Sequence, residues 1–140
     1  MENFRPLTLK SVIGDVAAFH HAFGIRNAPA PEARPTEATI ALRHRLMAEE
    51  NEEYLEAARA GDLVEVADAL GDMLYILCGT ILQHGMQDVI EEVFLEIQRS
   101  NMSKLGADGQ PIHRADGKVM KGPNYTPPDL SFVAEHVSGR

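Results

Sequence analysis

The stretch from Leu46 to Tyr75, LMAEENEEYLEAARAGDLVEVADALGDMLY, decides the fold because it predicts two helices joined by a tight turn. Gly61 is expected to end the first helix and Asp62 to begin the second, since glycine favours helix C-termini and aspartate favours N-caps. At about 100° per residue, Glu50 and Glu53 fall on the stripe where a helix buries apolar side chains. Two acids therefore occupy positions at which packing favours leucine.

The second helix of this pair carries its own row of acids. Glu65, Asp68 and Asp72 line up along one stripe of it. The opposite stripe is apolar throughout: Leu63, Ala67, Leu70, Leu74, Leu77 and Ile81. Carboxylates that share an inward surface repel one another and lose hydration, which costs several kcal/mol for each uncompensated ion. We therefore expect a cation to bind among these acids.

Single acids in these helices also have purely structural interpretations. Asp62 and Glu65 have the spacing of a capping box, in which Glu65 would close the N-terminus of its helix. A run such as Glu49-Glu50 is usually a solvated face when it stands alone. Asp72 stays open between an exposed acid and a member of the inward set. The coincidence of inward-facing acidic pairs on two adjacent antiparallel helices favours a functional site.

The patterns on both sides of this pair predict further helices. The four expected helices cover about 8–24, 36–60, 62–84 and 88–104. Thr36 and Asp88 are the expected N-caps of the second and the fourth. Asn101 and Lys104 continue the apolar stripe of the fourth helix, so these two polar residues are expected to face the same interior as the acids.

A change of composition marks the C-terminal part of the chain. Residues 105–125 are rich in glycine and basic residues, which predicts a loop or short hairpin. Thr126 followed by two prolines predicts a short final helix to about Val137. The expected fold is all-α: one domain over 1–140, with a four-helix core over about 8–104 and a basic, glycine-rich tail over 105–140.

Composition narrows the possible functions. The chain has 140 residues, a formal net charge of −8 and no strongly basic stretch, which argues against binding long nucleic acid. It lacks an apolar run of about 18 residues, so a membrane helix is not expected. The first residues lack the basic and apolar parts of a signal peptide, and Cys78 is the single cysteine. We therefore expect a cytoplasmic protein.

The acids offer only oxygen ligands, which favours Mg²⁺ or Mn²⁺ over softer metals. Zinc fits poorly, because neither acidic pair has a histidine or cysteine at ligand spacing. The Glu-x-x-His signature of di-iron bundles is missing, since Glu53 and Asp68 stand at the histidine positions. The sequence contains neither a Walker-type phosphate loop nor a nucleophile elbow.

The pattern Glu49-Glu50-x-x-Glu53 followed by Glu65-x-x-Asp68 resembles the signature of the all-α nucleoside triphosphate pyrophosphohydrolases. That superfamily includes MazG, the dimeric dUTPases, dCTP pyrophosphatases and phosphoribosyl-ATP pyrophosphohydrolase. The resemblance covers about residues 10–130 and is specific for the superfamily rather than for a substrate.

Two further segments support this resemblance. Asn101-Met-Ser-Lys104 looks like the family's phosphate-contacting element, and residues 115–125 look like the tail of small MazG-like proteins related to the dUTP-preferring ones. The resemblance implies that Mg²⁺, for which Mn²⁺ can substitute, is held by four acids: Glu50, Glu53, Glu65 and Asp68. It implies that Glu49 orients or deprotonates the attacking water. The expected substrate-binding residues are Asn101, Lys104, Lys118, Lys121 and Tyr125.

The implied reaction is hydrolysis between the α- and β-phosphates of a nucleoside triphosphate, giving a monophosphate and pyrophosphate. In-line displacement at phosphorus needs mostly positioning and charge neutralisation, which acids with metal ions supply. The expected substrates are dUTP or non-canonical nucleotides. Two alternatives stay open: a phosphoribosyl-ATP pyrophosphohydrolase, and a non-catalytic metal- or nucleotide-binding regulatory module. The expected assembly is a homodimer or a dimer of dimers.

Overall fold

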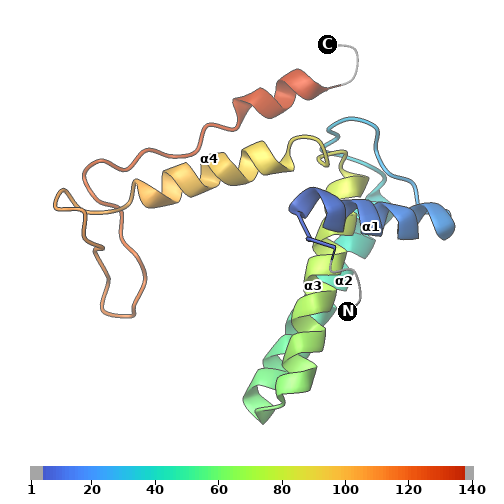
Figure 1. Ribbon diagram of the computed structural model, residues 1–140, viewed down its shortest axis with the longest axis horizontal. Helices are drawn as coiled ribbons and strands as arrows, with labels where there is room; N and C mark the ends of the chain where they lie inside the picture. The colour runs from blue at the N-terminus through green and yellow to red at the C-terminus, as the bar shows by residue number, and fades with distance from the viewer. Residues whose placement is uncertain (1–4, 138–140) are drawn as a thin grey trace. The chain divides into compact units, whose positions relative to one another are not determined.

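The computed structural model describes residues 5–137, and its regular elements are all helical. These elements are α1 (Leu9–Ala22), α2 (Glu37–Ala60), α3 (Leu63–Gln83), α4 (Ile90–Met102) and a short 3-10 helix, η1 (Ser131–His136) (Figure 1). Within the described residues, extended pairing is limited to an isolated antiparallel bridge between His113 and Val119. The prediction of an all-α fold with four main helices is therefore confirmed. None of the described helices is long and apolar enough to cross a membrane.

The chain divides into two compact units, one built around α1 to α3 and the other around α4 and the segment that follows it. The expectation of a single domain over the whole chain stays a prediction. All the acids of the expected metal site belong to the first unit, whereas Asn101, Lys104 and the tail belong to the second.

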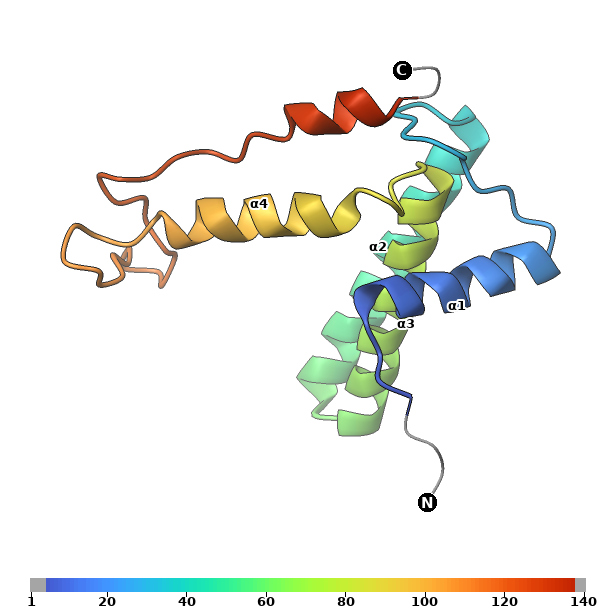
Figure 2. The same cartoon turned by 45° about the horizontal axis from the view of Figure 1, so that its top comes forward.

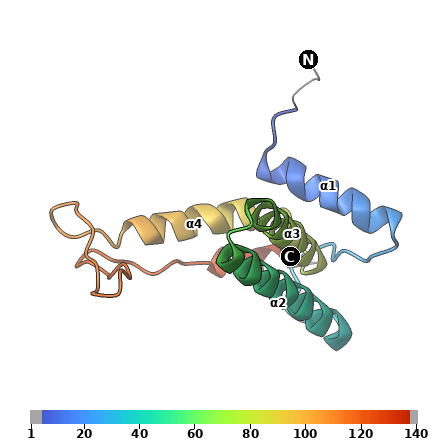
Figure 3. The same ribbon diagram turned by 90° about the horizontal axis from the view of Figure 1, so that it is seen from below.

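In the first unit, α2 and α3 form an antiparallel hairpin and lie side by side (Figures 1 and 3). Gly61 adopts the left-handed conformation with φ 70°, which ends α2 as predicted. The Asp62 carboxylate accepts a hydrogen bond from the backbone N–H of Glu65 at 3.1 Å and so caps α3, also as predicted. Because this turn is short, the last residues of α2 lie beside the first residues of α3. The acids of α2 therefore lie opposite those of α3.

The first helix, α1, packs across α3 (Figure 2). Ile13 and Val16 of α1 are buried, as are Cys78 and Leu82 of α3. The predicted apolar stripe of α3 lies elsewhere, and four of its residues are exposed: Leu63, Leu70, Leu74 and Leu77. The core of this unit therefore uses a different face of α3 from the one that carries most of the leucines.

In the second unit, the chain after α4 returns alongside that helix (Figures 1 and 2). The Ser100 hydroxyl donates to the Thr126 carbonyl at 2.9 Å, and the Gly122 N–H donates to the Lys104 carbonyl at 2.8 Å. A Cβ at Gly122 would lie 2.3 Å from the Leu105 carbonyl oxygen, so only glycine permits this close approach. These hydrogen bonds hold residues 122–126 of the glycine-rich tail against the end of α4.

Two helix starts differ from the prediction. Asp88 does not cap α4, because the N-cap is Val89 and its side chain makes no capping hydrogen bond. The final helix begins at Ser131 rather than after Thr126, and it is a 3-10 helix. The residue before a proline is pushed towards extended conformations, so the consecutive prolines delay the helix. The Asp129 carboxylate accepts from the Ser131 N–H at 3.0 Å and marks the actual start.

Candidate metal centre

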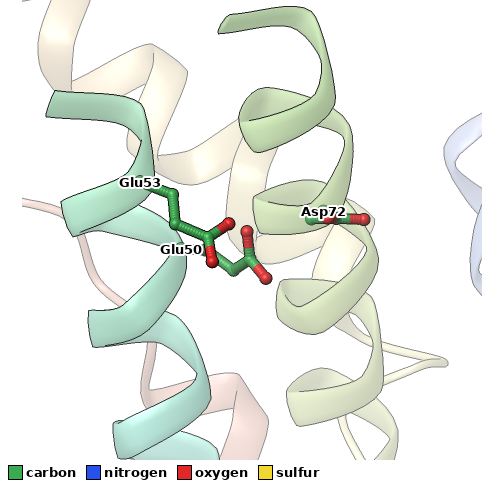
Figure 4. Close-up of side chains that lie close together, drawn as sticks. All are labelled: Glu50, Glu53 and Asp72. Atoms are coloured by element: carbon green, nitrogen blue, oxygen red, sulfur yellow. The ribbon is translucent and has the colours of Figure 1, made fainter. Parts of the chain in front are cut away.

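Three carboxylates meet where α2 faces α3. One oxygen from each of Glu50, Glu53 and Asp72 lies within 4.8 Å of the others. Figure 4 shows Glu50 and Glu53 extending from α2 towards α3, which carries Asp72. Glu50 and Glu53 are one helical turn apart, so their side chains leave α2 on the same side. We call these three residues the acid cluster.

Glu50 is the innermost member of the acid cluster. It is half-buried, and its Oε2 atom is shielded from solvent without a hydrogen-bond partner among the described residues. The pKa of Glu50 is raised to about 7, and burial is the largest cause. A hydrogen bond shared with Glu53 and the charges of Glu53, Asp72 and Asp68 contribute the rest of this shift. Near neutral pH the protein therefore holds a carboxylate that ionises only at a cost.

This environment fits a divalent cation. A buried carboxylate oxygen without a donor has a free acceptor site, which a cation can fill. The acid cluster supplies three oxygen ligands and no sulfur or nitrogen, which is the donor set that Mg²⁺ and Mn²⁺ prefer. A bound cation would also relieve the mutual repulsion that raises the pKa of Glu50.

The other two predicted ligands, Glu65 and Asp68, lie in an adjacent acidic pocket near the α2–α3 turn. This pocket has a volume of about 270 Å³ and is lined by Glu53, Glu56, Ala57, Ala60, Asp62, Glu65 and Asp68. The Asp62 N–H donates to the Ala57 carbonyl at 3.0 Å, so it does not need the Glu65 carboxylate as a cap. Glu53 belongs to both the acid cluster and this pocket. The structure thus groups Glu50 and Glu53 with Asp72, and Glu53 again with Glu65 and Asp68.

Glu49, the expected water-activating residue, stands next to the acid cluster on α2 but faces outward. Its side chain is 58% exposed, and its Oε1 atom lies 3.7 Å from Arg45 Nε. An exposed pair at this distance, four residues apart on one helix, contributes little to stability. The Glu49 carboxylate is therefore accessible to water and to a ligand.

The predicted substrate-binding residues lie in the second unit. Asn101 and Lys104 line a pocket of about 410 Å³ with four apolar residues: Met102, Leu105, Pro111 and Val119. The Lys121 ammonium lies 4.7 Å from the centre of the Tyr125 ring. Lys118 is held through its backbone, whose N–H donates to the Asp116 carboxylate at 3.1 Å. Its exposed ammonium is not tied down by that bond.

Asp72 is the residue that sequence reasoning left open and that the structure places with Glu50 and Glu53. A signal for it was present, because Asp72 follows Asp68 by one turn on the same stripe of α3. The family signature drew attention to Glu65 and Asp68 instead. Which of two acids one turn apart faces a neighbouring helix depends on the rotation of α3, and periodicity alone does not determine that rotation.

A search of protein families matches residues 16–101 to the phosphoribosyl-ATP pyrophosphohydrolase family. The match covers more than half of the chain and includes the acid cluster. The chain belongs to this family. As a member it is a nucleotide pyrophosphohydrolase, a hydrolase of phosphoanhydrides from a family that generally uses a divalent metal. Lys104 and the tail lie beyond the matched residues. No curated protein matches the chain.

Proposed function

We propose that this protein is a Mg²⁺-dependent nucleoside triphosphate pyrophosphohydrolase that cleaves between the α- and β-phosphates. Its products would be a nucleoside monophosphate and pyrophosphate. The expected substrates are dUTP or non-canonical nucleotides, whose removal protects the nucleotide pool. The observation that carries the proposal is the acid cluster, in which Glu50 keeps a shielded oxygen without a partner.

The proposed metal ligands are the three acids of the cluster, together with Glu65 and Asp68 of the adjacent pocket. When bound, Mg²⁺ supplies charge neutralisation for the triphosphate and makes water more acidic. Glu53 lies in both groups of acids, so it is suited to link two ligand sets. We propose Asp72 as a ligand in addition to the four acids that the family signature indicates.

Glu49 is the proposed general base. It is accessible and adjoins the acid cluster, so it can orient a water molecule and accept its proton. Asn101, Lys104, Lys118, Lys121 and Tyr125 are the proposed substrate contacts. Lysines and amide side chains suit the oxygens of a polyphosphate. These roles follow the family resemblance and need tests by substitution.

A homodimer is the proposed assembly. Four leucines of α3 are exposed over one face, Leu63 at 80%, Leu70 at 51%, Leu74 at 48% and Leu77 at 43%. An apolar row of this kind favours burial against another chain. Sedimentation equilibrium of the wild-type protein and of Leu74→Asp tests the proposal, which predicts a dimer and a monomer respectively.

The family description gives a second candidate substrate, phosphoribosyl-ATP. Hydrolysis of this compound would break the same type of bond with the same acids. A catalyst selective for it should leave ordinary and deoxy triphosphates intact. A direct comparison of the two kinds of substrate therefore separates the candidates.

The deciding experiment incubates the protein and Mg²⁺ with a panel of ribo- and deoxyribonucleoside triphosphates, dUTP and phosphoribosyl-ATP. Pyrophosphate and orthophosphate are measured separately. We expect a monophosphate and pyrophosphate, with no turnover when Mg²⁺ is chelated. Orthophosphate as the sole product, or no turnover of any member of the panel, would contradict the proposal. A non-catalytic binding module would give the second of these results.

A further inference from the structure

Arg43 of α2 is buried, with only 7% of its surface exposed. Its guanidinium crosses to α3, where Nη1 donates to Gln83 Oε1 at 3.0 Å and Nη2 approaches the Ile76 carbonyl at 3.4 Å. Gln83 in turn donates to the Arg26 carbonyl at 3.4 Å. Arg43 therefore ties α2 to α3 and, through Gln83, to the connector that follows α1.

No carboxylate of residues 5–137 forms an ion pair with Arg43, and its buried Nε–H has no partner there. Burial lowers the pKa of Arg43. Replacing a buried charge by an apolar residue is often neutral or favourable for stability. An arginine at this position needs another explanation, and the best attested use of a buried polar group is to specify one register of packed helices.

Gly79 makes room for Arg43 on α3. A Cβ at Gly79 would lie 3.0 Å from Arg43 Nη2, 3.0 Å from His20 Nε2 and 3.3 Å from Arg43 Nη1. His20 is itself buried and fixed, since its Nδ1 lies 2.6 Å from Asn27 Oδ1. The guanidinium of Arg43 thus occupies the space left by the missing side chain of Gly79. His20 of α1 lies next to the same space.

The pairing of Arg43 with Gly79 has the same register as the pairing of Glu50 with Asp72. On each helix the two positions are seven residues apart, which is about two turns or roughly 10 Å along antiparallel axes. The acid cluster therefore lies between two connections that join α2 to α3. One is the turn at Gly61 and Asp62, and the other is Arg43 seated at Gly79.

The three carboxylates lie close together, so their repulsion acts to separate α2 from α3 where Glu50 and Glu53 face Asp72. Connections on both sides of the cluster oppose that separation. Without Arg43, the side beyond the cluster would be held by helix packing and the contact between Thr80 and Met47.

We propose that Arg43, seated at Gly79, is a positioning residue that fixes the register and spacing of α2 and α3 and so assembles the acid cluster for metal binding. Arg43 does not contact the metal or the substrate. Its effect reaches the metal through Glu50, Glu53 and Asp72. The proposal rests on the function proposed above, because metal binding is one of its readouts.

The first test measures Mn²⁺ binding by electron paramagnetic resonance for wild type, Arg43→Met and Gly79→Ala. Methionine keeps an unbranched apolar stem, but it is shorter than arginine, carries no charge and cannot donate hydrogen bonds. Substitution of a residue that orients metal ligands typically lowers metal affinity by about 10- to 100-fold. We expect both variants to bind Mn²⁺ at least about tenfold more weakly. Alanine raises helix propensity, so weaker binding by Gly79→Ala would come from the close contact of its Cβ with Arg43 and His20 and not from the helix itself.

Two controls match these variants. Leu82→Ala removes buried side-chain volume from the same unit without touching the Arg43 contacts, and Gly14→Ala adds a Cβ at a helical glycine that has no atom within 4 Å of that position. Measured where all variants are folded, both controls should bind Mn²⁺ as wild type does. Weakening by Leu82→Ala equal to that by Arg43→Met would overturn the proposal, since general destabilisation would then explain the loss.

The second test needs no catalysis. Spin labels on Glu52→Cys and Gly71→Cys report the distance between α2 and α3 in a Cys78→Ala background. Both positions are exposed, neither is one of the four leucines of the proposed dimer face, and a Cβ at Gly71 meets no atom within 4 Å. We expect a narrow distance distribution in the metal-free wild type, a broad one with Arg43→Met, and narrowing again with saturating Mg²⁺. An unchanged distribution together with unchanged Mn²⁺ affinity in Arg43→Met would overturn the inference and leave the proposed function intact. Failure of the wild type to bind Mn²⁺ would overturn both.

Discussion

The pKa values of two glutamates, Glu50 and Glu96, are shifted in opposite directions from the ordinary value of 4.5. Glu50 of the acid cluster has a pKa raised to about 7, first by burial and then by Glu53 and other acids. Glu96 of α4 has a pKa lowered to about 2, first by hydrogen bonds from Arg99 and then by one from the Asp129 N–H. The distances for Glu96 are 2.8 Å to Arg99 Nη2 and 3.0 Å to Asp129 N.

The difference separates a structural acid, Glu96, from the acid that we propose to be functional, Glu50. Glu96 is satisfied within its own unit, where it joins α4 to the start of the final helix. Glu50 is surrounded by like charge and has one oxygen without a partner. Folding therefore stabilises the ionised form of Glu96 and leaves Glu50 with an acceptor that the proposed cation would fill. A perturbed pKa by itself does not mark a functional site, because structural ion pairs also shift pKa values.

The largest expected effect comes from a third carboxylate, the exposed Glu49. Glu49→Gln should reduce turnover by about 100- to 10,000-fold, because general-base catalysis contributes that much. Mn²⁺ affinity should stay at the wild-type value, since Glu49 is not a proposed ligand. Steady-state kinetics and a Mn²⁺ titration check the two parts. Equal loss of metal affinity would place Glu49 among the ligands instead.

Removing the charge of Glu50 should reduce turnover, whereas removing the charge of Glu96 should not. Glu50→Gln should reduce turnover at least about 100-fold, since loss of a ligand should exceed the loss seen for outer residues. Glu96→Gln should leave turnover unchanged, because Glu96 is neither a proposed metal ligand nor a proposed substrate contact. Assays of both variants at saturating Mg²⁺ provide the comparison. Comparable activity in Glu50→Gln and wild type would show that the acid cluster is not catalytic.

The pH dependence of stability should also have opposite signs for the two acids. Glu50 has a folded pKa above its ordinary value of 4.5, so the folded chain binds the extra proton. Metal-free stability should therefore fall as pH rises from 4.5 to about 7. Chemical denaturation with a chelator present measures this. In Glu50→Gln the decline of stability with rising pH should be smaller than in wild type. An identical decline would show that another group causes it.

For Glu96 the window lies on the acid side. Its folded pKa is below the ordinary value of 4.5, so its stabilising contribution is complete above 4.5 and is lost as pH falls towards 2. Glu96→Gln should remove this part of acid denaturation and slightly increase hydrogen exchange near the C-terminal end of α4. Because the Glu96–Arg99 pair is partly open to solvent, this is the smallest of the expected effects. Wild-type exchange rates in the variant would contradict it.

Much of the fold follows from local sequence signals. Thr36, Gly61 and Asp62 act through short-range hydrogen bonds and backbone conformation, and helix periodicity gave the four helices. The errors occurred where a local signal had a competitor. Asp88 has a capping side chain but does not use it, and the consecutive prolines delayed the last helix.

The site is only partly predictable for a different reason. Glu50 and Glu53 could be identified because acids on an inward stripe conflict with packing. The grouping of Asp72 with them depends on the rotation of α3, which is a tertiary property. The burial of Arg43 could not be predicted from the sequence either, because arginine on a helix is usually exposed. Its burial depends on the gap at Gly79.

The most direct test of the central claim is a Mn²⁺ titration of wild type, Glu50→Gln, Asp72→Asn and Glu96→Gln at neutral pH. If the acid cluster is the metal centre, wild type and Glu96→Gln bind Mn²⁺ equally, whereas Glu50→Gln and Asp72→Asn bind it at least about tenfold more weakly. Without metal, Glu50→Gln and Asp72→Asn should be at least as stable as wild type, because each variant loses a repelling charge. Undiminished Mn²⁺ binding by Glu50→Gln and Asp72→Asn would contradict the account.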